Sequence, residues 1–238
     1  MVNVRLNPAH DLKAYAAEYK RNGIVQIHDF FAPEAATAVR EVLVSLPWRL
    51  ICQNDEHQLL LLTREQLMAM PQTELRKLEA GMAERAAANL GYTYLAYPMI
   101  EAERDGWDPG HPIHEVTRFV NGPQFLGVGR ALLAEPAITK VDAHATKYQR
   151  GHYLTRHSDD GRYRRAAYTL GFSPGWQPDW GGLLMFLDER QDVASGYLPR
   201  FNTLTVFDGL RVHSVTSISQ FTPQPRLSVT GWFRAEPA

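Results

Sequence analysis

The sequence predicts a mostly β domain of the jelly-roll sandwich or barrel type, supported by helices from the first half of the chain. After Lys140, short apolar runs alternate with Gly, Pro and Asp turns, a pattern typical of sheets built from many short strands. Before Lys140, several apolar runs instead follow helical spacing. No linker separates the halves, so we expect one domain over 1–238. Residues 1–139 would be a supporting region of helices and strands, and 140–234 the motif-bearing β core.

Local patterns place the elements of each half. Helices are expected where apolar residues recur on one face and a Gly or Pro ends the run. Strands are expected where short apolar stretches lie between turns. In the first half, the expected helices are 11–21, a segment from Pro33 to just before Pro47, Gln72–Leu90 and a segment from Asn121 or Pro123 to Ala134, and the expected strands are 24–28, 48–53 and 57–62. In the second half, the expected strands are 141–148, 154–158, 165–172, 183–187, 202–207, 212–216 and 226–234.

The composition favours a cytoplasmic globular protein. Of the 238 residues, 45% are hydrophobic, and 25 Lys and Arg balance 26 Asp and Glu, for a net charge of -1. Such a balance gives no reason to expect nucleic acid or an anionic membrane as a partner. The single cysteine, Cys52, cannot form an internal disulfide, which fits a reducing compartment. No apolar run approaches the length of a transmembrane helix.

A possible metal site begins in the β-rich half with His157 and Asp159. If 154–159 is extended, these side chains point to the same side of the sheet. An imidazole beside a carboxylate provides two-thirds of the 2-His-1-carboxylate triad of non-haem iron oxygenases. The chain has nine histidines, so a His-x-Asp pair is a weak signal alone, and a surface or turn pairing stays open.

Two later residues could complete a site. His213 follows a turn at the start of a β-rich run, where its ring can point into a barrel; a core histidine bonded to backbone is the alternative. Arg226 heads an alternating strand and faces the same way as Ser228 and Thr230. A buried guanidinium needs an anion, and a dicarboxylate cosubstrate would fit its planar fork. A structural salt bridge to one of the acidic residues is the alternative.

Five motifs in order carry a family resemblance. They are Tyr148-x-x-Gly151-x-x-Leu154-x-x-His157-x-Asp159, Trp176-x-x-x-Trp180-Gly181-Gly182, Pro199-x-Phe201-Asn202-x-Leu204-x-x-Phe207, His213-Ser214-Val215 and Arg226-Leu227-Ser228-Val229-Thr230-Gly231-Trp232-Phe233. The set resembles the prolyl-hydroxylase branch of the Fe(II)/2-oxoglutarate-dependent dioxygenases. The Trp-Gly-Gly segment and the last motif are most similar to the prolyl 3-hydroxylases that modify a ribosomal protein. Residues 23–46 resemble the entry segment of the same family.

The resemblance implies a double-stranded β-helix, or cupin-like, core and a specific set of site residues. His157, Asp159 and His213 would ligate Fe(II), and no catalytic residue beyond this metal site is implied. The cosubstrate 2-oxoglutarate would bind through Arg226, with Thr230 and Tyr148 as further contacts, and O₂ would be the oxidant, with ascorbate as a possible stimulant. Trp232 is expected in the core.

The implied function is hydroxylation of a C–H bond with release of succinate and CO₂. A prolyl residue of a protein is the first expectation for the substrate; a free amino acid or a biosynthetic small molecule is the alternative. A cupin-like module that binds a metal or ligand without turnover is the non-catalytic alternative. The turn-rich segment 104–112 could be a lid over the site or ordinary surface.

One position departs from the family. Gly171 stands where relatives often have a tyrosine that helps to hold the cosubstrate carboxylate. We therefore expect either weaker binding or another donor in its place, and Tyr148 is the candidate for that donor.

Overall fold

The computed structural model describes residues 3–56, 58–88 and 91–236. The predicted strand start at His57 and the predicted helix end at Leu90 lie outside these residues. No helix in the described part of the chain has the length and apolar character needed to cross a membrane.

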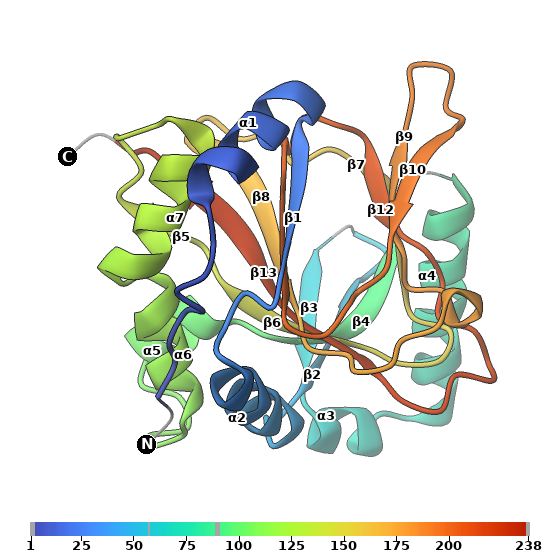
Figure 1. Cartoon of the computed structure of the whole chain (residues 1–238). Helices are drawn as coiled ribbons and strands as arrows, with labels where there is room; N and C mark the ends of the chain where they lie inside the picture. Colours follow the sequence, from blue (N-terminus) through green and yellow to red (C-terminus); the bar gives the residue numbers. More distant parts are fainter. Residues whose placement is uncertain (1–2, 57, 89–90, 237–238) are drawn as a thin grey trace.

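Strands of both halves join into one curled, mostly antiparallel sheet (Figure 1). In the described residues, ten strands follow one another in the order β1-β11-β8-β13-β6-β4-β7-β12-β9-β10, while β2, β3 and β5 attach at its sides. The predicted jelly-roll class is confirmed. The strands are β1 (Ile24–His28), β2 (Arg49–Gln53), β3 (Leu59–Leu62), β4 (Tyr92–Tyr97), β5 (Lys140–Val141), β6 (His144–Tyr148), β7 (Tyr153–His157), β8 (Arg164–Gly171), β9 (Leu184–Leu187), β10 (Val193–Tyr197), β11 (Thr203–Phe207), β12 (His213–Val215) and β13 (Arg226–Arg234).

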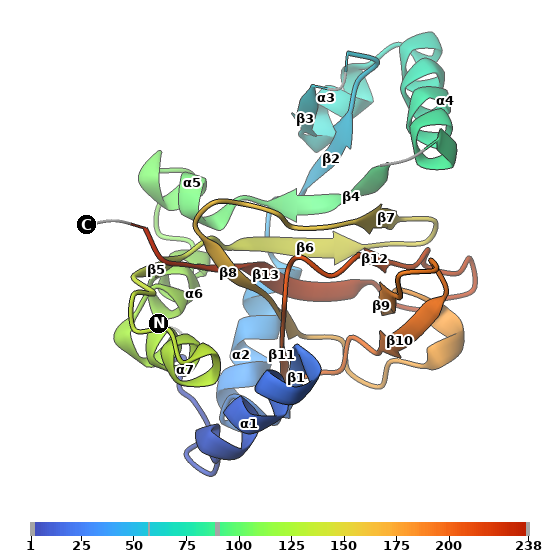
Figure 2. The same cartoon turned by 90° about the horizontal axis from the view of Figure 1, so that it is seen from above.

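Helices from the first half buttress this sheet. They are α1 (Leu12–Asn22), α2 (Pro33–Val44), α3 (Arg64–Ala69), α4 (Gln72–Ala88), α5 (Met99–Arg104), α6 (Ile113–Val120) and α7 (Pro123–Leu133). The main core combines buried residues of α2, α6 and α7 with those of β1, β8, β11 and β13. Figure 2 shows β2, β3, α3 and α4 on the other side of the sheet, away from α1, α2 and α7.

The two faces of β13 separate the core from the site. Leu227, Val229 and Phe233 are buried in the main core on the helical side. Successive side chains of a strand point to opposite faces, so the alternate residues from Arg226 onward face the other way. Strand β13 pairs with β6 in a register that places Arg226 opposite Tyr148 and Thr230 opposite His144. These two strands therefore form one polar wall on the side opposite α2, α6 and α7.

The sequence prediction missed five of the described strands and α-helices. Strands β4 and β10 and helices α3, α5 and α6 were not expected from local patterns. The omission of β4 matters most, because it pairs with β6 on one side and β7 on the other and so joins the two parts of the sheet. The expected helix 72–90 is present as α4, but Gly81 is its only buried residue in the described part.

Candidate active site

A cavity of about 430 Å³ lies between the two parts of the sheet. One wall comes from β6 and β13, and the opposite wall from β7 and β12. Ile51 of β2 and Leu59 of β3 line it from the hairpin that projects beyond the sheet. All six site residues expected from the sequence line this cavity: His157, Asp159, His213, Arg226, Thr230 and Tyr148.

Cross-strand pairing assembles the possible metal ligands. His213, the first residue of β12, pairs directly with His157, the last residue of β7. Asp159 follows β7 rather than continuing it, and its backbone N–H donates to the carbonyl of Gly209 at 2.7 Å. The turn that leads into β12 therefore fixes the carboxylate beside both rings. One ligand atom of each of the three residues lies within 4.8 Å of the others.

Hydrogen bonds on the far side of each ring leave the Nε2 atoms of His157 and His213 without a proton. His157 Nδ1 lies 2.9 Å from the Thr155 carbonyl, and His213 Nδ1 lies 2.8 Å from the Arg211 carbonyl. The tautomer that satisfies both contacts places the proton on Nδ1, as in most metal-bound histidines. The Nε2 lone pairs then point at the Asp159 carboxylate, at 3.6 Å from His157 and 3.3 Å from His213. Such a set of donors fits a cation.

The charge states also suit a metal ligand set. Burial lowers the pKa of His157, and the nearby His213 ring lowers it further. Burial raises the pKa of Asp159, but the neighbouring His213 and His157 lower it by more, so the net shift is downward. Near neutral pH, His157 is therefore neutral and Asp159 ionised, as metal ligation requires. Two imidazoles and one carboxylate match the donor set of non-haem iron sites.

Arg226 is a buried cation that faces the cavity without an acidic partner. Its side chain is only 4% exposed, and desolvation lowers its pKa. Within the described residues its one hydrogen bond is from Nη1 to Ser228 Oγ at 3.0 Å, and its Nε has no partner. No acidic side chain is among its contacts in the described part of the chain, so the alternative of a structural salt bridge has no support there. An uncompensated buried charge is costly, so the position fits an anion bound from the cavity.

Tyr148 and Thr230 flank this arginine in different ways. The guanidinium carbon of Arg226 lies 5.1 Å from the centre of the Tyr148 ring, which also stacks on Tyr94 at 4.7 Å. Burial raises the pKa of Tyr148, so its hydroxyl keeps a proton to donate. The hydroxyl of Thr230 instead donates to the Tyr168 carbonyl at 2.8 Å. A cosubstrate would have to compete with that carbonyl for the Thr230 proton.

The space over Gly171 is filled by backbone. A Cβ at this position would lie 2.2 Å from the carbonyl oxygen of Arg200, closer than atoms can approach. Neighbouring backbone contacts hold that segment, because Asn202 donates its N–H to the Gly171 carbonyl at 2.8 Å. The strand that relatives use for a tyrosine is therefore covered here by residues 199–200.

The structure decides between the two alternatives for 104–112 and gives Trp232 a position that the sequence did not indicate. The lid hypothesis for 104–112 fails because none of its residues lines the cavity, and the segment connects α5 to α6 on the helical side. Tyr97 donates to Asp108 in this segment at 2.8 Å, and Trp107 packs against the main core. Trp232, expected in the core, lines the cavity because it shares the alternating face of β13 with Arg226.

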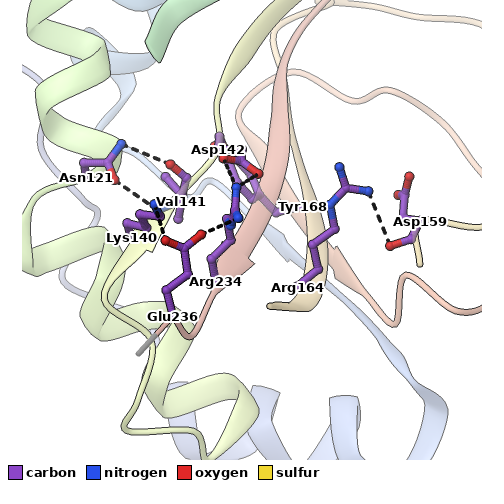
Figure 3. A network of polar contacts seen from close by, with 9 residues as sticks. All are labelled: Asn121, Lys140, Val141, Asp142, Asp159, Arg164, Tyr168, Arg234 and Glu236. Atoms are coloured by element: carbon purple, nitrogen blue, oxygen red, sulfur yellow. Dashed lines mark hydrogen bonds and ion pairs between the residues drawn. The ribbon is translucent and has the colours of Figure 1, made fainter. Parts of the chain in front are cut away.

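Several cavity residues were not expected from the sequence. His144 lies on β6 and Tyr94 on β4, while Arg164, the first residue of β8, stacks over Trp232 at 3.6 Å from the ring centre. Figure 3 shows Arg164 reaching toward Asp159, whose backbone carbonyl accepts from Arg164 Nη1 at 3.5 Å. The alternating pattern of Tyr92–Tyr97 could have indicated β4. No local signal shows that His144 faces a cavity.

The comparisons with known proteins agree with this geometry. Residues 143–234 match the family model described as 2OG-Fe(II) oxygenase superfamily. This region of the chain is similar to that superfamily. The matched superfamily uses Fe(II), 2-oxoglutarate and O₂, and the His157, Asp159 and His213 cluster lies within the matched region. The family resemblance stated from the sequence is confirmed.

The chain is also similar to individual oxygenases and prolyl hydroxylases. The chain is 32% identical over 101 residues to prolyl 3-hydroxylase OGFOD1 of Mus musculus. This match covers 39% of the chain and 18% of that relative. The match therefore spans less than a fifth of the relative's length. An oxidoreductase of the 2OG-Fe(II) oxygenase family from Burkholderia pseudomallei aligns with a TM-score of 0.63 at 11% identity, covering 98% of this chain and 95% of that one. A prolyl hydroxylase from Trichoplax adhaerens, in complex with a hypoxia inducible factor peptide fragment, aligns with a TM-score of 0.62 at 16% identity, covering 94% and 89%.

Proposed function

We propose that the chain is an Fe(II)- and 2-oxoglutarate-dependent dioxygenase that hydroxylates a prolyl residue of a protein substrate. The observation that carries this proposal is the pairing of two complementary sites in one cavity. His157, Asp159 and His213 form a cluster that fits a cation, and Arg226 offers a buried charge that fits an anion. A metal-bound dicarboxylate satisfies both sites at once.

The metal ligands act through fixed lone pairs. The backbone carbonyls of Thr155 and Arg211 hold the Nδ1 protons, so both Nε2 atoms stay available to Fe(II). Asp159 adds the one negative charge of the set. Three protein ligands leave the remaining coordination positions for cosubstrate and O₂.

Arg226 and Tyr148 would hold the distal carboxylate of 2-oxoglutarate. The guanidinium can bind a carboxylate through two parallel hydrogen bonds; Nη1 is held by Ser228 Oγ, and Nε has no partner among the described residues. With Fe(II) bound, oxidative decarboxylation of 2-oxoglutarate to succinate and CO₂ uses one oxygen atom of O₂, and the other enters the substrate C–H bond as hydroxyl. Apolar residues such as Leu154, Leu184 and Val215 line the same cavity and limit the access of water.

The proposed substrate class is a prolyl residue of a protein. Two similar proteins are a prolyl 3-hydroxylase and a prolyl hydroxylase in complex with a peptide fragment. We extend that substrate class to this chain, with a free amino acid or biosynthetic small molecule as the competing substrate. The lone buried thiol of Cys52 fits a reducing compartment, and we propose the cytoplasm.

The test measures the reaction and its product separately. Purified protein is incubated with Fe(II), ascorbate and 2-oxoglutarate, and succinate release is measured with and without proline-containing peptides. We expect peptide-stimulated succinate release and a mass gain of one oxygen atom on proline. Succinate release without any modified peptide would favour a small-molecule substrate, and no release at all would favour a binding module.

A further inference from the structure

His144 lies in the cavity wall, at the end away from Arg226. It begins β6, and the alternating residues His144, Thr146 and Tyr148 line the cavity from that strand. His144 pairs with Thr230, whereas Tyr148 pairs with Arg226, four residues along each strand. Four residues of strand correspond to about 13 Å. The two side chains therefore mark opposite ends of one wall.

The imidazole of His144 is neutral and has no bonding partner in the described protein. Burial lowers its pKa to about 4, against the opposing charges of Asp142 and Asp159. Asp142 is held by Arg234 at 2.9 and 3.1 Å, as Figure 3 shows. In the described part of the chain no group hydrogen-bonds either ring nitrogen, and the nearest aromatic partner is Trp232 at 5.9 Å. The residue is partly buried and lines the cavity, so its free ring nitrogens can bond a group that enters there.

The cosubstrate does not account for this free imidazole. An extended five-carbon dicarboxylate is about as long as two extended residues, roughly 7 Å. Anchored at Arg226, it ends well short of a strand position about 13 Å away. Arg164, the nearby cation, already stacks on Trp232. The donor and acceptor of His144 therefore face the part of the cavity left for the substrate.

We propose that His144 is a specificity-determining residue that donates its ring N–H to a carbonyl oxygen of the substrate chain, next to the target proline. This inference rests on the proposed function. A prolyl residue has no N–H of its own, so the amide bond that precedes it offers only an acceptor. A neutral imidazole can supply the matching donor, and its low pKa keeps it neutral at working pH.

The experiment compares His144→Leu, which removes both polar atoms, with His144→Gln, which keeps an N–H donor. A mixture of short synthetic peptides with one central proline and randomised flanks is offered to the Fe(II)- and 2-oxoglutarate-loaded protein. The peptides that gain one oxygen atom with the unmodified chain are then made singly for kinetics. Calorimetric binding of the same peptides without O₂ gives a readout that is independent of turnover.

We expect His144→Leu to raise the peptide KM and Kd about tenfold, as the loss of one buried hydrogen bond implies. The Kd of 2-oxoglutarate and the bound iron should stay unchanged, and His144→Gln should recover most of the peptide affinity. Unchanged peptide affinity in His144→Leu overturns the assignment of His144 alone. Equal losses for peptide and 2-oxoglutarate also overturn it, because they indicate a structural role. An unmodified chain that neither releases succinate nor binds peptide overturns the proposed function as well.

Discussion

At one end of the cavity, here called the metal end, the proposed metal ligands His157, Asp159 and His213 face one another. At the other end, here called the arginine end, the single cation of Arg226 faces the cavity. The carboxylate of Asp159 lies 3.6 Å and 3.3 Å from the Nε2 atoms of His157 and His213. Arg226, although buried, bonds only to a serine hydroxyl among the described residues. The first arrangement concentrates lone pairs, and the second leaves a positive charge without compensation.

This difference indicates why the two sites share one cavity. Each is costly without a ligand, because buried polar groups lose their hydration and gain little in return. A cation relieves the first site and an anion the second, and a metal-bound dicarboxylate provides both. The comparison predicts that substitutions at one end affect metal binding and those at the other affect cosubstrate binding.

The largest effect is expected at the metal end. Alanine at His157, Asp159 or His213 removes one of only three protein ligands, so we expect iron binding and 2-oxoglutarate turnover to be lost. Metal content and succinate release measure the effect, and circular dichroism checks the fold. His28→Ala is a matched control, since this exposed histidine lies on β1 outside the cavity. Full activity with normal iron content in any ligand variant would remove that residue from the site.

At the arginine end, Arg226→Ala should weaken 2-oxoglutarate binding while iron binding persists. The loss of a charge-assisted pair costs about 1.5–3 kcal/mol, which corresponds to roughly 10- to 150-fold in affinity. Arg226→Lys should restore only part of it, because an ammonium group cannot form the planar fork. Anaerobic titration of the iron-loaded protein measures the affinity, with Arg156→Ala as a control at an exposed arginine of β7. If iron binding falls as much as cosubstrate binding, the two ends are not separate sites.

His144, a further polar residue of the cavity, links the stability of the fold to pH. Its pKa in the folded protein is about 4, below the ordinary value of 6.5. As pH falls, the unfolded chain takes up the proton first, so this residue's contribution to stability is lost between about pH 6.5 and pH 4. Between pH 7 and pH 5 the unfolding free energy should drop by up to about 2 kcal/mol more in the unmodified chain than in His144→Leu. Urea unfolding at both pH values measures this; equal drops would show that the imidazole is solvated.

Tyr148→Phe should have a smaller effect at the arginine end. The phenol lies beside Arg226, and its raised pKa keeps the hydroxyl protonated as a donor to a carboxylate. We expect the Kd of 2-oxoglutarate to rise about tenfold, or roughly 1.4 kcal/mol for one hydrogen bond to a charged group. A Tyr at position 171 would not recover this loss, since the Arg200 carbonyl occupies the space over Gly171. A change of less than about twofold in the Phe variant would remove Tyr148 from the cosubstrate contacts.

Local sequence patterns identified residues that line one cavity, whereas they missed parts of the fold around it. His157, Asp159, His213 and Arg226 fall in motifs whose spacing is local, so each could be identified without knowing the strand order. Their convergence depends on the β7–β12 pairing, which joins residues more than fifty positions apart and has no local signature. The predicted geometry of Asp159 was wrong in detail: β7 ends at His157, and the Gly209 carbonyl rather than the strand positions the carboxylate.

Two other residues show what local reasoning omits. Trp232 was placed in the core as an aromatic residue of a terminal strand, yet it lies six positions after Arg226 and shares its face of β13. The same alternation that predicted Arg226 could have placed Trp232. His144 could not have been found in this way, because the cavity that it lines forms only when β6, β13 and the opposite wall come together.

The smallest effect is expected for Thr230→Val, which tests how far the arginine end extends along β13. The Thr230 hydroxyl already donates to the Tyr168 carbonyl at 2.8 Å, so it has no second proton for a carboxylate. If that bond persists when cosubstrate binds, the substitution should change the Kd of 2-oxoglutarate by less than about threefold, or roughly 0.7 kcal/mol. It should lower thermal stability instead, because the Tyr168 carbonyl loses a partner. A tenfold loss of cosubstrate affinity with unchanged stability would mean that the hydroxyl turns from Tyr168 to the carboxylate, and the arginine end would then reach as far as Thr230.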